Sequence, residues 1–217
     1  MSPRSAASSR IVWKRRHAII SATPTTLFLG DGDSIIDGNE KSEHEELDVY
    51  GQLRNELKGT NLFLIGMMGS GKSAIGKVVS SILDVPFVDA DVEIEKAAKL
   101  SIPEIFERHG EKFFRDKEDQ IIKRLLREKR CILATGGGAF MNKKIRASIK
   151  EQGVSVWLNA DLETLWKRVK HKNTRPLLRT DNPRETLAKI YTDRIETYSL
   201  ADVIIESRGT SSLDKMA

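Results

Sequence analysis

The 217-residue sequence has a single cysteine, Cys131. One cysteine excludes an internal disulfide and a cysteine-rich metal site. Because Cys131 stands in the apolar stretch "CILAT", we expect a small buried side chain rather than a reactive thiol, in a reducing compartment. The sequence also has no apolar run near the length of about 18 residues that a membrane-spanning helix requires. We therefore expect neither a membrane segment nor a secretory signal.

Acidic residues are missing from the first twenty positions, which hold five basic ones: Arg4, Arg10, Lys14, Arg15 and Arg16. The whole chain has a formal net charge of +5, so the remaining residues carry no net charge. A protein that binds nucleic acid through its folded part normally presents a basic face there. The sequence therefore argues against a nucleic-acid partner.

Residues 1–58 differ in composition from the rest of the chain. An Arg- and Ser-rich start is followed by the acidic stretch "DGDSIIDGNEKSEHEELD", which contains no aromatic residue. Such a segment buries too little apolar surface to offset its ordering entropy, so we predict a disordered leader. The alternatives are an organelle-targeting peptide, whose composition is similar, or a translation start placed too early. The expected location is the cytoplasm, or an organelle if the leader is a targeting peptide.

From Thr60 onward, five short apolar runs alternate with stretches of helical spacing: "NLFLIG", "VPFVDA", "CILAT", "VSVWL" and "DVIIE". This alternation indicates an α/β fold in which helices cover a parallel sheet. Ser101 with Glu104 has the pattern of a capping box, and Gly110 that of a helix end. The residues expected in the core are Phe87, Val156, Trp157, Leu165 and Trp166.

Two later stretches do not fit this alternation. "HKNTRPLLRTDNP" is polar and basic and contains Pro176 and Pro183, so we predict a loop that acts as a lid over about residues 171–183. "SSLDKMA" has the pattern of a helix start, so the sequence stops inside an expected helix.

The stretch from Gly66 to Ser73 spells G-x-x-x-x-G-K-S directly after an expected strand and before an expected helix. This is the context of a P-loop, in which backbone N–H groups and the helix dipole hold the phosphates of a nucleotide. Lys72 would reach the β and γ phosphates, and Ser73 would offer its hydroxyl to Mg²⁺. The alternative is a glycine-rich turn with an incidental lysine, which the matching strand, spacing and helix disfavour.

The usual acidic residue of a P-loop NTPase is missing, because the strand "CILAT" runs into Gly136, Gly137 and Gly138 without a carboxylate. An N-K-x-D segment is also absent, which argues against motor, GTPase and transporter classes. Asp89 and Asp91 instead follow the second strand, where they should face the γ phosphate. Paired acids there suit a small kinase, although either could simply cap the next helix.

Arg115 and Glu118 lie one helical turn apart in "FFRDKE". Taken alone, this spacing favours a surface ion pair, because such pairs are common and contribute little stability. The alternative is that the glutamate holds the arginine toward an anionic ligand.

These segments together resemble the shikimate kinase family. "GMMGSGKS", "DAD", "SIPEIFERHGEKFFRDKE", "TGGGA", "TRPLL" and "DRIETY" occur in the order and spacing found there, from about Asn61 to Glu206. The resemblance implies a nucleoside-monophosphate-kinase-like fold, with three αβα layers around a five-stranded parallel sheet and a mobile lid. It also implies transfer of the γ-phosphoryl group of ATP to the 3-hydroxyl of shikimate, in aromatic amino-acid biosynthesis.

The resemblance also suggests roles for individual residues. Asp91 falls on the acid that contacts the acceptor, and with Lys72 and Arg175 of the lid it makes up the catalytic set. Asp89 and Ser73 fall on the metal side. The nucleotide-binding positions are Gly66, Gly69, Ser70, Gly71, Lys72, Ser73, Ala74, Arg168 and Arg175.

The acceptor side follows in the same way. Arg115 and Arg194 match the two arginines that clamp the shikimate carboxylate, and Glu118 would steady Arg115. Guanidinium groups suit this task because they bind a carboxylate with two parallel hydrogen bonds. The substrate-binding positions are Asp91, Arg115, Gly136, Gly137, Gly138 and Arg194. Arg168 is the least specific of all the assignments, since a solvated helix face explains it equally well.

The implied cofactors are ATP and Mg²⁺, and the implied partner is shikimate, bound by a monomer without nucleic acid or membrane. Two rival classes share parts of the pattern. A gluconate-type kinase would have the P-loop but less reason for the two arginines with the glycine triplet. A non-catalytic kinase relative would be expected to have lost at least one residue of the catalytic or metal set. Nothing before Asn61, and no final helix after Ala217, matches the family.

Overall fold

The structure is a computed structural model that describes residues 11–13, 57, 59–128, 131–172 and 174–207. Its centre is a six-stranded sheet with the order β1-β6-β5-β2-β4-β3. The strands are β1 (Ile11–Trp13), β2 (Asn61–Ile65), β3 (Phe87–Asp89), β4 (Ile132–Ala134), β5 (Gly153–Ala160) and β6 (Val203–Ser207). The strands from β2 to β6 pair in parallel, which confirms the predicted five-stranded parallel sheet.

Strand β1 is an addition to the predicted sheet. It pairs antiparallel with β6 at the sheet edge, with Val12 opposite Ile204. Its residues belong to the segment 1–58 predicted as a leader, of which the structure describes only Ile11–Trp13 and Leu57. The rest of that segment and the stretch "SSLDKMA" lie outside the described residues, so both predictions stay untested.

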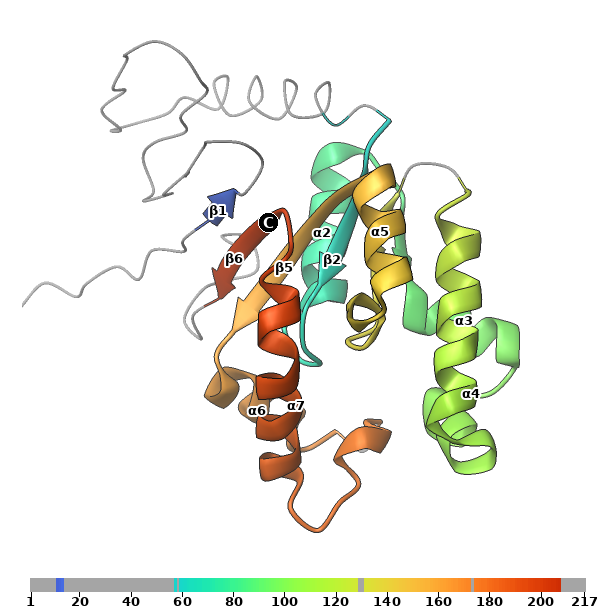
Figure 1. Ribbon diagram of the computed structural model, residues 1–217, viewed down its shortest axis with the longest axis vertical. Helices are drawn as coiled ribbons and strands as arrows, with labels where there is room; N and C mark the ends of the chain where they lie inside the picture. The colour runs from blue at the N-terminus through green and yellow to red at the C-terminus, as the bar shows by residue number, and fades with distance from the viewer. Residues whose placement is uncertain (1–10, 14–56, 58, 129–130, 173, 208–217) are drawn as a thin grey trace, which may run out of the picture.

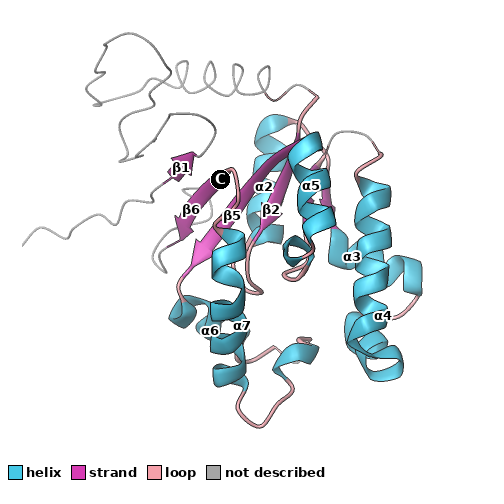
Figure 2. Cartoon of the chain, viewed as in Figure 1, coloured by secondary structure: helices cyan, strands magenta, loops and turns pink. Residues whose placement is uncertain are grey.

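Helices cover both faces of the sheet, as Figures 1 and 2 show. Side chains alternate along β2: Phe63 and Ile65 join a cluster that includes residues of α4, α5 and α7, whereas Leu64 joins residues of α2 on the opposite face. This is the predicted three-layer arrangement. The helices are α2 (Lys72–Leu83), α3 (Ala90–Ala98), α4 (Ile102–Leu125), α5 (Lys143–Gln152), α6 (Leu162–Val169) and α7 (Pro183–Tyr198). Two short 3₁₀ helices are η1 (Ala139–Met141) and η2 (Pro176–Leu178).

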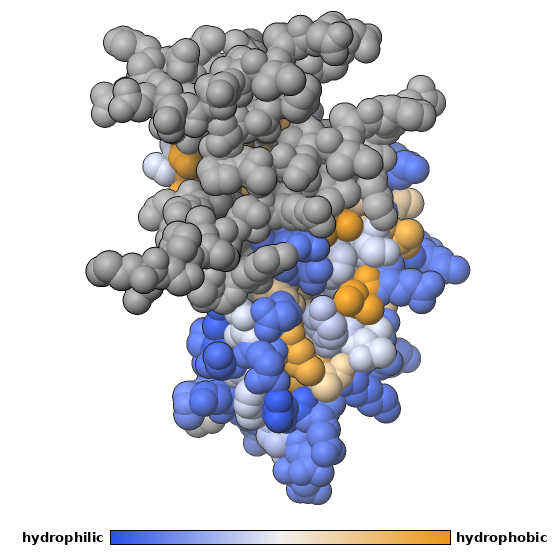
Figure 3. Space-filling model, turned by 90° about the vertical axis from the view of Figure 1, so that its left-hand side faces the viewer, coloured by the Kyte–Doolittle hydropathy of each residue, from blue (hydrophilic) through white to orange (hydrophobic). Residues whose placement is uncertain are grey.

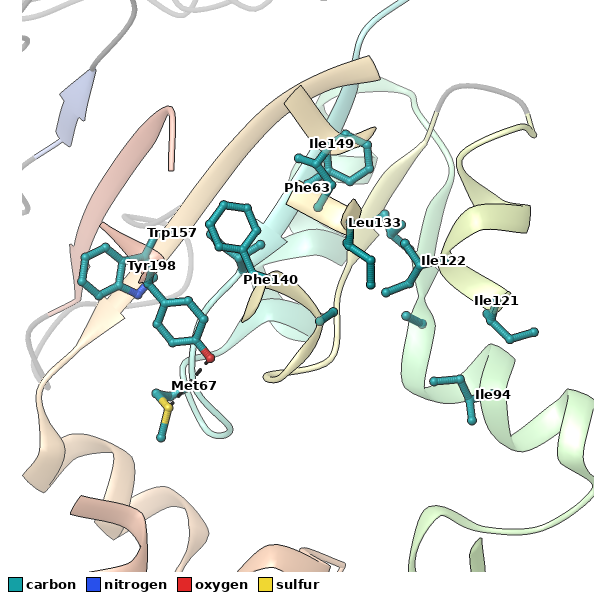
Figure 4. Close-up of a cluster of buried hydrophobic side chains, with 14 of the residues drawn as sticks. Phe63, Met67, Ile94, Ile121, Ile122, Leu133, Phe140, Ile149, Trp157 and Tyr198 are labelled. Carbon is teal, nitrogen blue, oxygen red and sulfur yellow. Dashed lines mark hydrogen bonds between the residues drawn. The ribbon is translucent and has the colours of Figure 1, made fainter. Parts of the chain in front are cut away.

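The larger core cluster lies on the α4, α5 and α7 side of the sheet. Figure 4 shows part of it, from Trp157 and Tyr198 through Phe140 and Leu133 to Ile94. Of the predicted core residues, Trp157 and Leu165 are buried, and Phe87, Val156 and Trp166 are half-buried. Cys131 is buried and outside any disulfide, as predicted, and burial raises the pKa of its thiol.

The described surface carries little exposed apolar side-chain area. Among its large apolar side chains only Val92 and Leu200 are exposed, and Figure 3 shows apolar surface as small separate areas between hydrophilic residues. No helix in the described part of the chain combines the length and apolarity needed to span a lipid bilayer.

Helix α4 begins as predicted, but at Gly110, where a helix end was predicted, it is only interrupted and continues to Leu125. The Ser101 Oγ atom accepts a hydrogen bond from the Glu104 N–H (3.4 Å), and a Glu104 carboxylate oxygen accepts one from the Ser101 N–H (2.8 Å), which completes a capping box. At Gly110 the backbone leaves the helical conformation, with φ 77° and ψ 175°. This left-handed φ favours glycine, and it separates the first turns from the part of α4 that carries Arg115.

The cap of α4 provides a stability test. We expect Ser101→Ala to lower the free energy of unfolding by about 1 kcal/mol, because the amino end of the helix loses a side-chain acceptor. Chemical denaturation measures this change. Ser81→Ala is the matched control, since Ser81 is exposed within α2 and alanine favours a helix interior there. Equal stability of the two variants would show that the Ser101 side chain contributes nothing to the cap.

Candidate active site

The phosphate-binding loop begins where β2 ends. β2 lies between β4 and β5, so the carboxyl end of this strand is a switch point at which parallel sheets bind ligands. Gly66 follows Ile65 directly, and the loop ends at Gly71, the N-cap of α2. The free N–H groups and partial positive charge of the helix start therefore lie at this loop.

The loop lines a cavity of about 540 Å³, a volume typical of small-molecule pockets. Among the residues around it are all the predicted nucleotide-binding residues except Gly66, together with the two predicted aspartates: Gly69, Ser70, Gly71, Lys72, Ser73, Ala74, Arg168, Arg175, Asp89 and Asp91. We call this cavity the P-loop pocket. The structure thus brings together residues that are up to about a hundred positions apart in the chain.

Lys72 lies against its own loop. Its Nζ atom donates hydrogen bonds to the backbone carbonyls of Gly66 (2.9 Å) and Met67 (3.0 Å). Burial lowers the pKa of the Lys72 ammonium to about 8, although the carboxylates of Asp91 and Asp89 oppose that change. The lysine therefore stays charged at neutral pH and is available to anionic oxygens in the pocket.

Arg168 is held at the same pocket from α6. Its Nη1 atom donates a hydrogen bond to the Gly69 carbonyl (3.1 Å), and the side chain is half-buried. The interpretation of Arg168 as a solvated helix residue is therefore wrong. The structure instead connects α6 to the phosphate-binding loop through this arginine.

Asp89 has two hydrogen bonds at the end of β3. Its Oδ1 atom accepts from the Asp91 N–H (3.0 Å) and caps α3, and its Oδ2 atom accepts from the Ser73 hydroxyl (2.5 Å). The cap interpretation is thus correct for Asp89, and the other carboxylate oxygen still faces the P-loop. One aspartate therefore serves the helix and the pocket at once.

Asp91, in the first turn of α3, lines the same pocket. Burial and the neighbouring charge of Asp89 raise the pKa of its carboxyl, while Lys72 and Arg175 oppose that rise. A carboxylate whose pKa is raised is a stronger proton acceptor, which is a property of general bases.

The side-chain oxygen atoms of Ser73 and Asp89 are suitable ligands for a magnesium ion. Both present oxygen atoms, and the short contact between them places a hydroxyl and a carboxylate side by side at the pocket. Mg²⁺ prefers oxygen ligands and commonly takes only one or two from the protein beside substrate phosphates and water. No cluster of three or more His, Cys, Asp or Glu side chains that could hold a metal ion is found in the described ranges.

A second pocket adjoins the first and contains the whole predicted acceptor set. Its lining includes Asp91, Arg115, Glu118, Gly136, Gly137, Gly138 and Arg194, with apolar walls from Ile102, Phe106, Phe114, Pro176 and Leu177. We call it the clamp pocket, after its two arginines. Four residues line both pockets: Met68, Asp91, Gly137 and Arg175. The two pockets therefore meet at Asp91.

Arg115 is held in place by two glutamates. Its Nη1 atom donates to Glu118 (2.9 Å), while Nη2 and Nε both donate to Glu111 (2.8 and 3.2 Å). Glu118 is only 2% exposed, so the surface-pair interpretation of Arg115 and Glu118 is wrong. Burial raises the pKa of the Glu118 carboxyl against the opposing charge of Arg115. The Glu118 Oε1 atom has no hydrogen-bond partner among the described residues.

The glycine triplet is packed closely against the side chains of the clamp. A Cβ atom at Gly136 would overlap the Glu118 carboxylate, and one at Gly138 would overlap the Arg115 guanidinium. At Gly137 it would lie 3.3 Å from the Arg194 Nη1 atom. The absence of Cβ atoms thus lets the clamp side chains approach the backbone of the triplet.

The predicted lid lies over the junction of the pockets. Arg175 precedes η2, lines both pockets, and has a buried Nε atom without a hydrogen-bond partner in the described part of the chain. A buried donor of this kind is costly unless a ligand accepts from it. Thr174, Pro176 and Leu177 of the same segment line the clamp pocket.

Several site residues were not singled out by the sequence. Glu111 braces Arg115, Met68 lies between the pockets, and the Tyr198 hydroxyl donates to the Gly137 carbonyl. The only available signals were spacings: Glu111 is four residues before Arg115, and Tyr198 is four after Arg194. Such spacings are too common to identify a site.

The family model and two similar sequence relatives agree on one family. The family model described as shikimate kinase matches residues 68–217. A shikimate kinase of Ruegeria pomeroyi is 56% identical over 153 residues, which cover 70% of this chain and 78% of that protein. One of Cereibacter sphaeroides is 54% identical over 166 residues, covering 76% and 82%.

Solved structures give the same result. A shikimate kinase from Acinetobacter baumannii in complex with shikimate superposes with a TM-score of 0.69 at 31% identity, covering 75% of this chain and 90% of that one. The enzyme from Aquifex aeolicus has a TM-score of 0.61 at 35% identity, covering 72% and 91%.

The lowered pKa of Lys72 predicts a pH effect on stability. Between pH 8 and 10.5 the unfolded chain keeps the Lys72 proton while the folded chain loses it, so stability from this group rises with pH. We expect the free energy of unfolding of the wild-type protein to increase relative to Lys72→Met over this range, without nucleotide. Denaturation at several pH values measures it, and a constant difference would show that the lysine is not desolvated.

Proposed function

The chain belongs to the shikimate kinase family, and from that membership we propose that ATP binds the P-loop pocket while shikimate binds the clamp pocket. The reaction is transfer of the γ-phosphoryl group of ATP to the 3-hydroxyl of shikimate, which gives shikimate 3-phosphate and ADP in aromatic amino-acid biosynthesis. One observation supports the division above all: the two pockets share Met68, Asp91, Gly137 and Arg175, so donor and acceptor would meet there.

On the nucleotide side, the loop Gly66–Ser73 and the start of α2 hold the phosphates. Backbone N–H groups and the helix dipole attract the anionic oxygens. Lys72 exchanges its contacts with the Gly66 and Met67 carbonyls for phosphate oxygens, and its charge offsets the charge that develops on the transferred group. Arg168 supports this loop from α6.

On the acceptor side, Asp91 is the proton acceptor. The 3-hydroxyl oxygen attacks the γ phosphorus, its proton passes to the Asp91 carboxylate, and the bond from phosphorus to the β-phosphate oxygen breaks to release ADP. The raised pKa of Asp91 suits this role, because the carboxyl then holds the proton more readily.

The shikimate carboxylate binds between Arg115 and Arg194. Glu118 and Glu111 fix the plane of Arg115 from two sides, so little side-chain entropy is lost when the carboxylate arrives. The N–H groups of the glycine triplet donate to no other described residue, which leaves them available to ring oxygens or the carboxylate.

Ser73 and Asp89 would hold a magnesium ion bound with ATP. When bound, the ion neutralises phosphate charge and orients the β and γ phosphates. Asp89 keeps its second oxygen on the Asp91 N–H, so the same side chain holds the first turn of α3 in place.

Lid residues 171–183 close the site over both ligands. Arg175 would then donate from its unpaired Nε atom to the transferred phosphoryl group, while Pro176 and Leu177 cover the clamp pocket. Excluding water in this way strengthens the charge interactions and limits hydrolysis of ATP.

The proposal extends to the organisation of the whole chain. Residues 59–217 are the kinase domain, and residues 1–58 are a leader that takes no part in catalysis. The enzyme acts as a monomer in the cytoplasm, without nucleic acid or membrane as a partner. The neutral charge balance outside the first twenty residues supports the absence of a nucleic-acid partner, and the P-loop pocket supports a small-molecule substrate.

The reaction is tested by ADP release from MgATP with shikimate, with gluconate, and with no acceptor. We expect release that depends on shikimate alone. Asp91→Asn should lower kcat by at least about a hundredfold while ATP still binds, because the proton acceptor is lost. Release with gluconate would support the rival kinase class, and near-normal turnover by the variant would remove Asp91 from the acceptor role.

The arginine clamp predicts that a change at Arg115 raises the KM for shikimate more than the KM for ATP. Arg115→Ala should raise the KM for shikimate by about ten- to a hundredfold, because a charged hydrogen-bonded partner of the carboxylate is lost. The KM for ATP should change little. Arg108→Ala is the matched control, because this exposed arginine on α4 lines neither pocket and its ion pair among the described residues is with Glu104 (3.6 Å). Equal effects on both substrates would indicate that Arg115 is structural.

A further inference from the structure

Tyr198 places a hydroxyl group at the boundary between the apolar core and the clamp pocket. It is the last residue of α7, is 1% exposed, and packs its ring against Trp157 with ring centres 5.9 Å apart. Figure 4 shows its hydroxyl pointing away from Trp157 toward Met67 of the phosphate-binding loop, 3.9 Å from the sulfur. A phenylalanine would fill the same space without the cost of burying a hydroxyl. The hydroxyl therefore needs a separate explanation.

Its partner is the carbonyl of Gly137, to which the Tyr198 hydroxyl donates a hydrogen bond. The same oxygen accepts a second hydrogen bond from the Arg194 Nη1 atom (2.8 Å). Arg194 and Tyr198 are four residues apart and so lie on the same side of α7. One helix thus holds one carbonyl of the glycine triplet from two side chains.

The orientation of the Gly137 carbonyl also fixes the direction of the Gly138 N–H. Because a peptide unit is planar and trans, the N–H of Gly138 points opposite to the Gly137 carbonyl. That N–H donates to no other described residue, and Gly138 lines the clamp pocket. Gly137 also lies against the phosphate-binding loop, since a Cβ atom there would be 3.6 Å from the Gly66 carbonyl oxygen and 3.7 Å from the Met68 nitrogen.

We propose that Tyr198 is a positioning residue: its hydroxyl fixes the peptide between Gly137 and Gly138 and so aims the Gly138 N–H at the acceptor. The ligand of that N–H is an oxygen of the hydroxylated carboxylic acid in the clamp pocket. This inference rests on the proposed assignment of the clamp pocket to shikimate. It adds that a buried core side chain sets the direction of a hydrogen-bond donor in this pocket.

The chemistry of the hydroxyl suits this task. Burial raises the pKa of Tyr198, so the group remains protonated, and a donor, throughout the neutral pH range. Arg194, by contrast, is shared between the Gly137 carbonyl and the carboxylate it is proposed to bind. Tyr198 therefore keeps the peptide in place while Arg194 responds to the ligand.

The test compares Tyr198→Phe with Tyr191→Phe. Tyr191 is half-buried on the same helix and packs against the same core cluster, so its variant controls for loss of a hydroxyl from α7. Tyr198→Phe should raise the KM for shikimate about three- to tenfold, the effect of one hydrogen bond, with the KM for ATP unchanged within about twofold. Tyr191→Phe should behave as wild type.

NMR signals of the glycine amides report directly on the peptide between Gly137 and Gly138. Only Gly137 and Gly138 follow another glycine in the sequence, so in protein labelled with ¹³C-carbonyl, ¹⁵N-glycine a carbonyl-filtered spectrum shows their amide signals alone, and shikimate should move them. The same signals should be displaced by Tyr198→Phe without shikimate, and not by Tyr191→Phe. Unchanged signals together with a wild-type KM for shikimate would overturn the inference.

Failure of the proposed function can be distinguished from failure of the inference about Tyr198. If the wild-type protein itself fails to bind shikimate, the proposed function fails, whatever the variants do. If Tyr198→Phe does not fold, the wild-type chain is labelled with 3-fluorotyrosine. The chain has 3 tyrosines, so Tyr50→Phe and Tyr191→Phe identify the other two signals and leave that of Tyr198. Shikimate should then shift the ¹⁹F signal of Tyr198 but not that of Tyr191, and an unmoved Tyr198 signal would contradict the proposal.

Discussion

The parallel pairing of β2 with β4 on one side and β5 on the other is the constraint on which the site depends. It brings the carboxyl ends of neighbouring strands to one edge of the sheet. The phosphate-binding loop leaves β2, Asp89 ends β3, and the glycine triplet follows β4 at that same edge. Residues far apart in the chain therefore meet without any long connection between them.

Charge burial is the second organising feature. Burial removes Lys72, Asp91 and Glu118 from the solvent that would stabilise their charges. The pKa of Lys72 is lowered as a result, and those of Asp91 and Glu118 are raised. Each carboxylate has a cationic neighbour, so the network as a whole is compensated while single members keep unused hydrogen-bonding capacity. A site of this kind is prepared for a ligand that carries both anionic and hydroxyl groups.

Sequence reasoning succeeded where a signal is local. The P-loop, the capping box at Ser101 and the five apolar runs each occupy a few consecutive residues, and the structure contains all of them. It failed where burial decides: the spacing of Arg115 and Glu118 fits a surface pair as well as a clamp, and only packing under the triplet distinguishes them. The role of Tyr198 could not be predicted from the sequence for the same reason, since its partner is a backbone atom 61 positions away. Strand β1 gave no signal because three residues are too few to show a pattern.

The close packing of the triplet has a consequence for how this sequence can vary. Gly136 and Glu118 occupy adjoining space with no margin for even a methyl group, and so do Gly138 and Arg115. A methyl group at either glycine would displace the end of the side chain that faces it. Because Arg115 and Glu118 are ion-paired, a shift of one would disturb the other, so the four positions are coupled through a single ion pair.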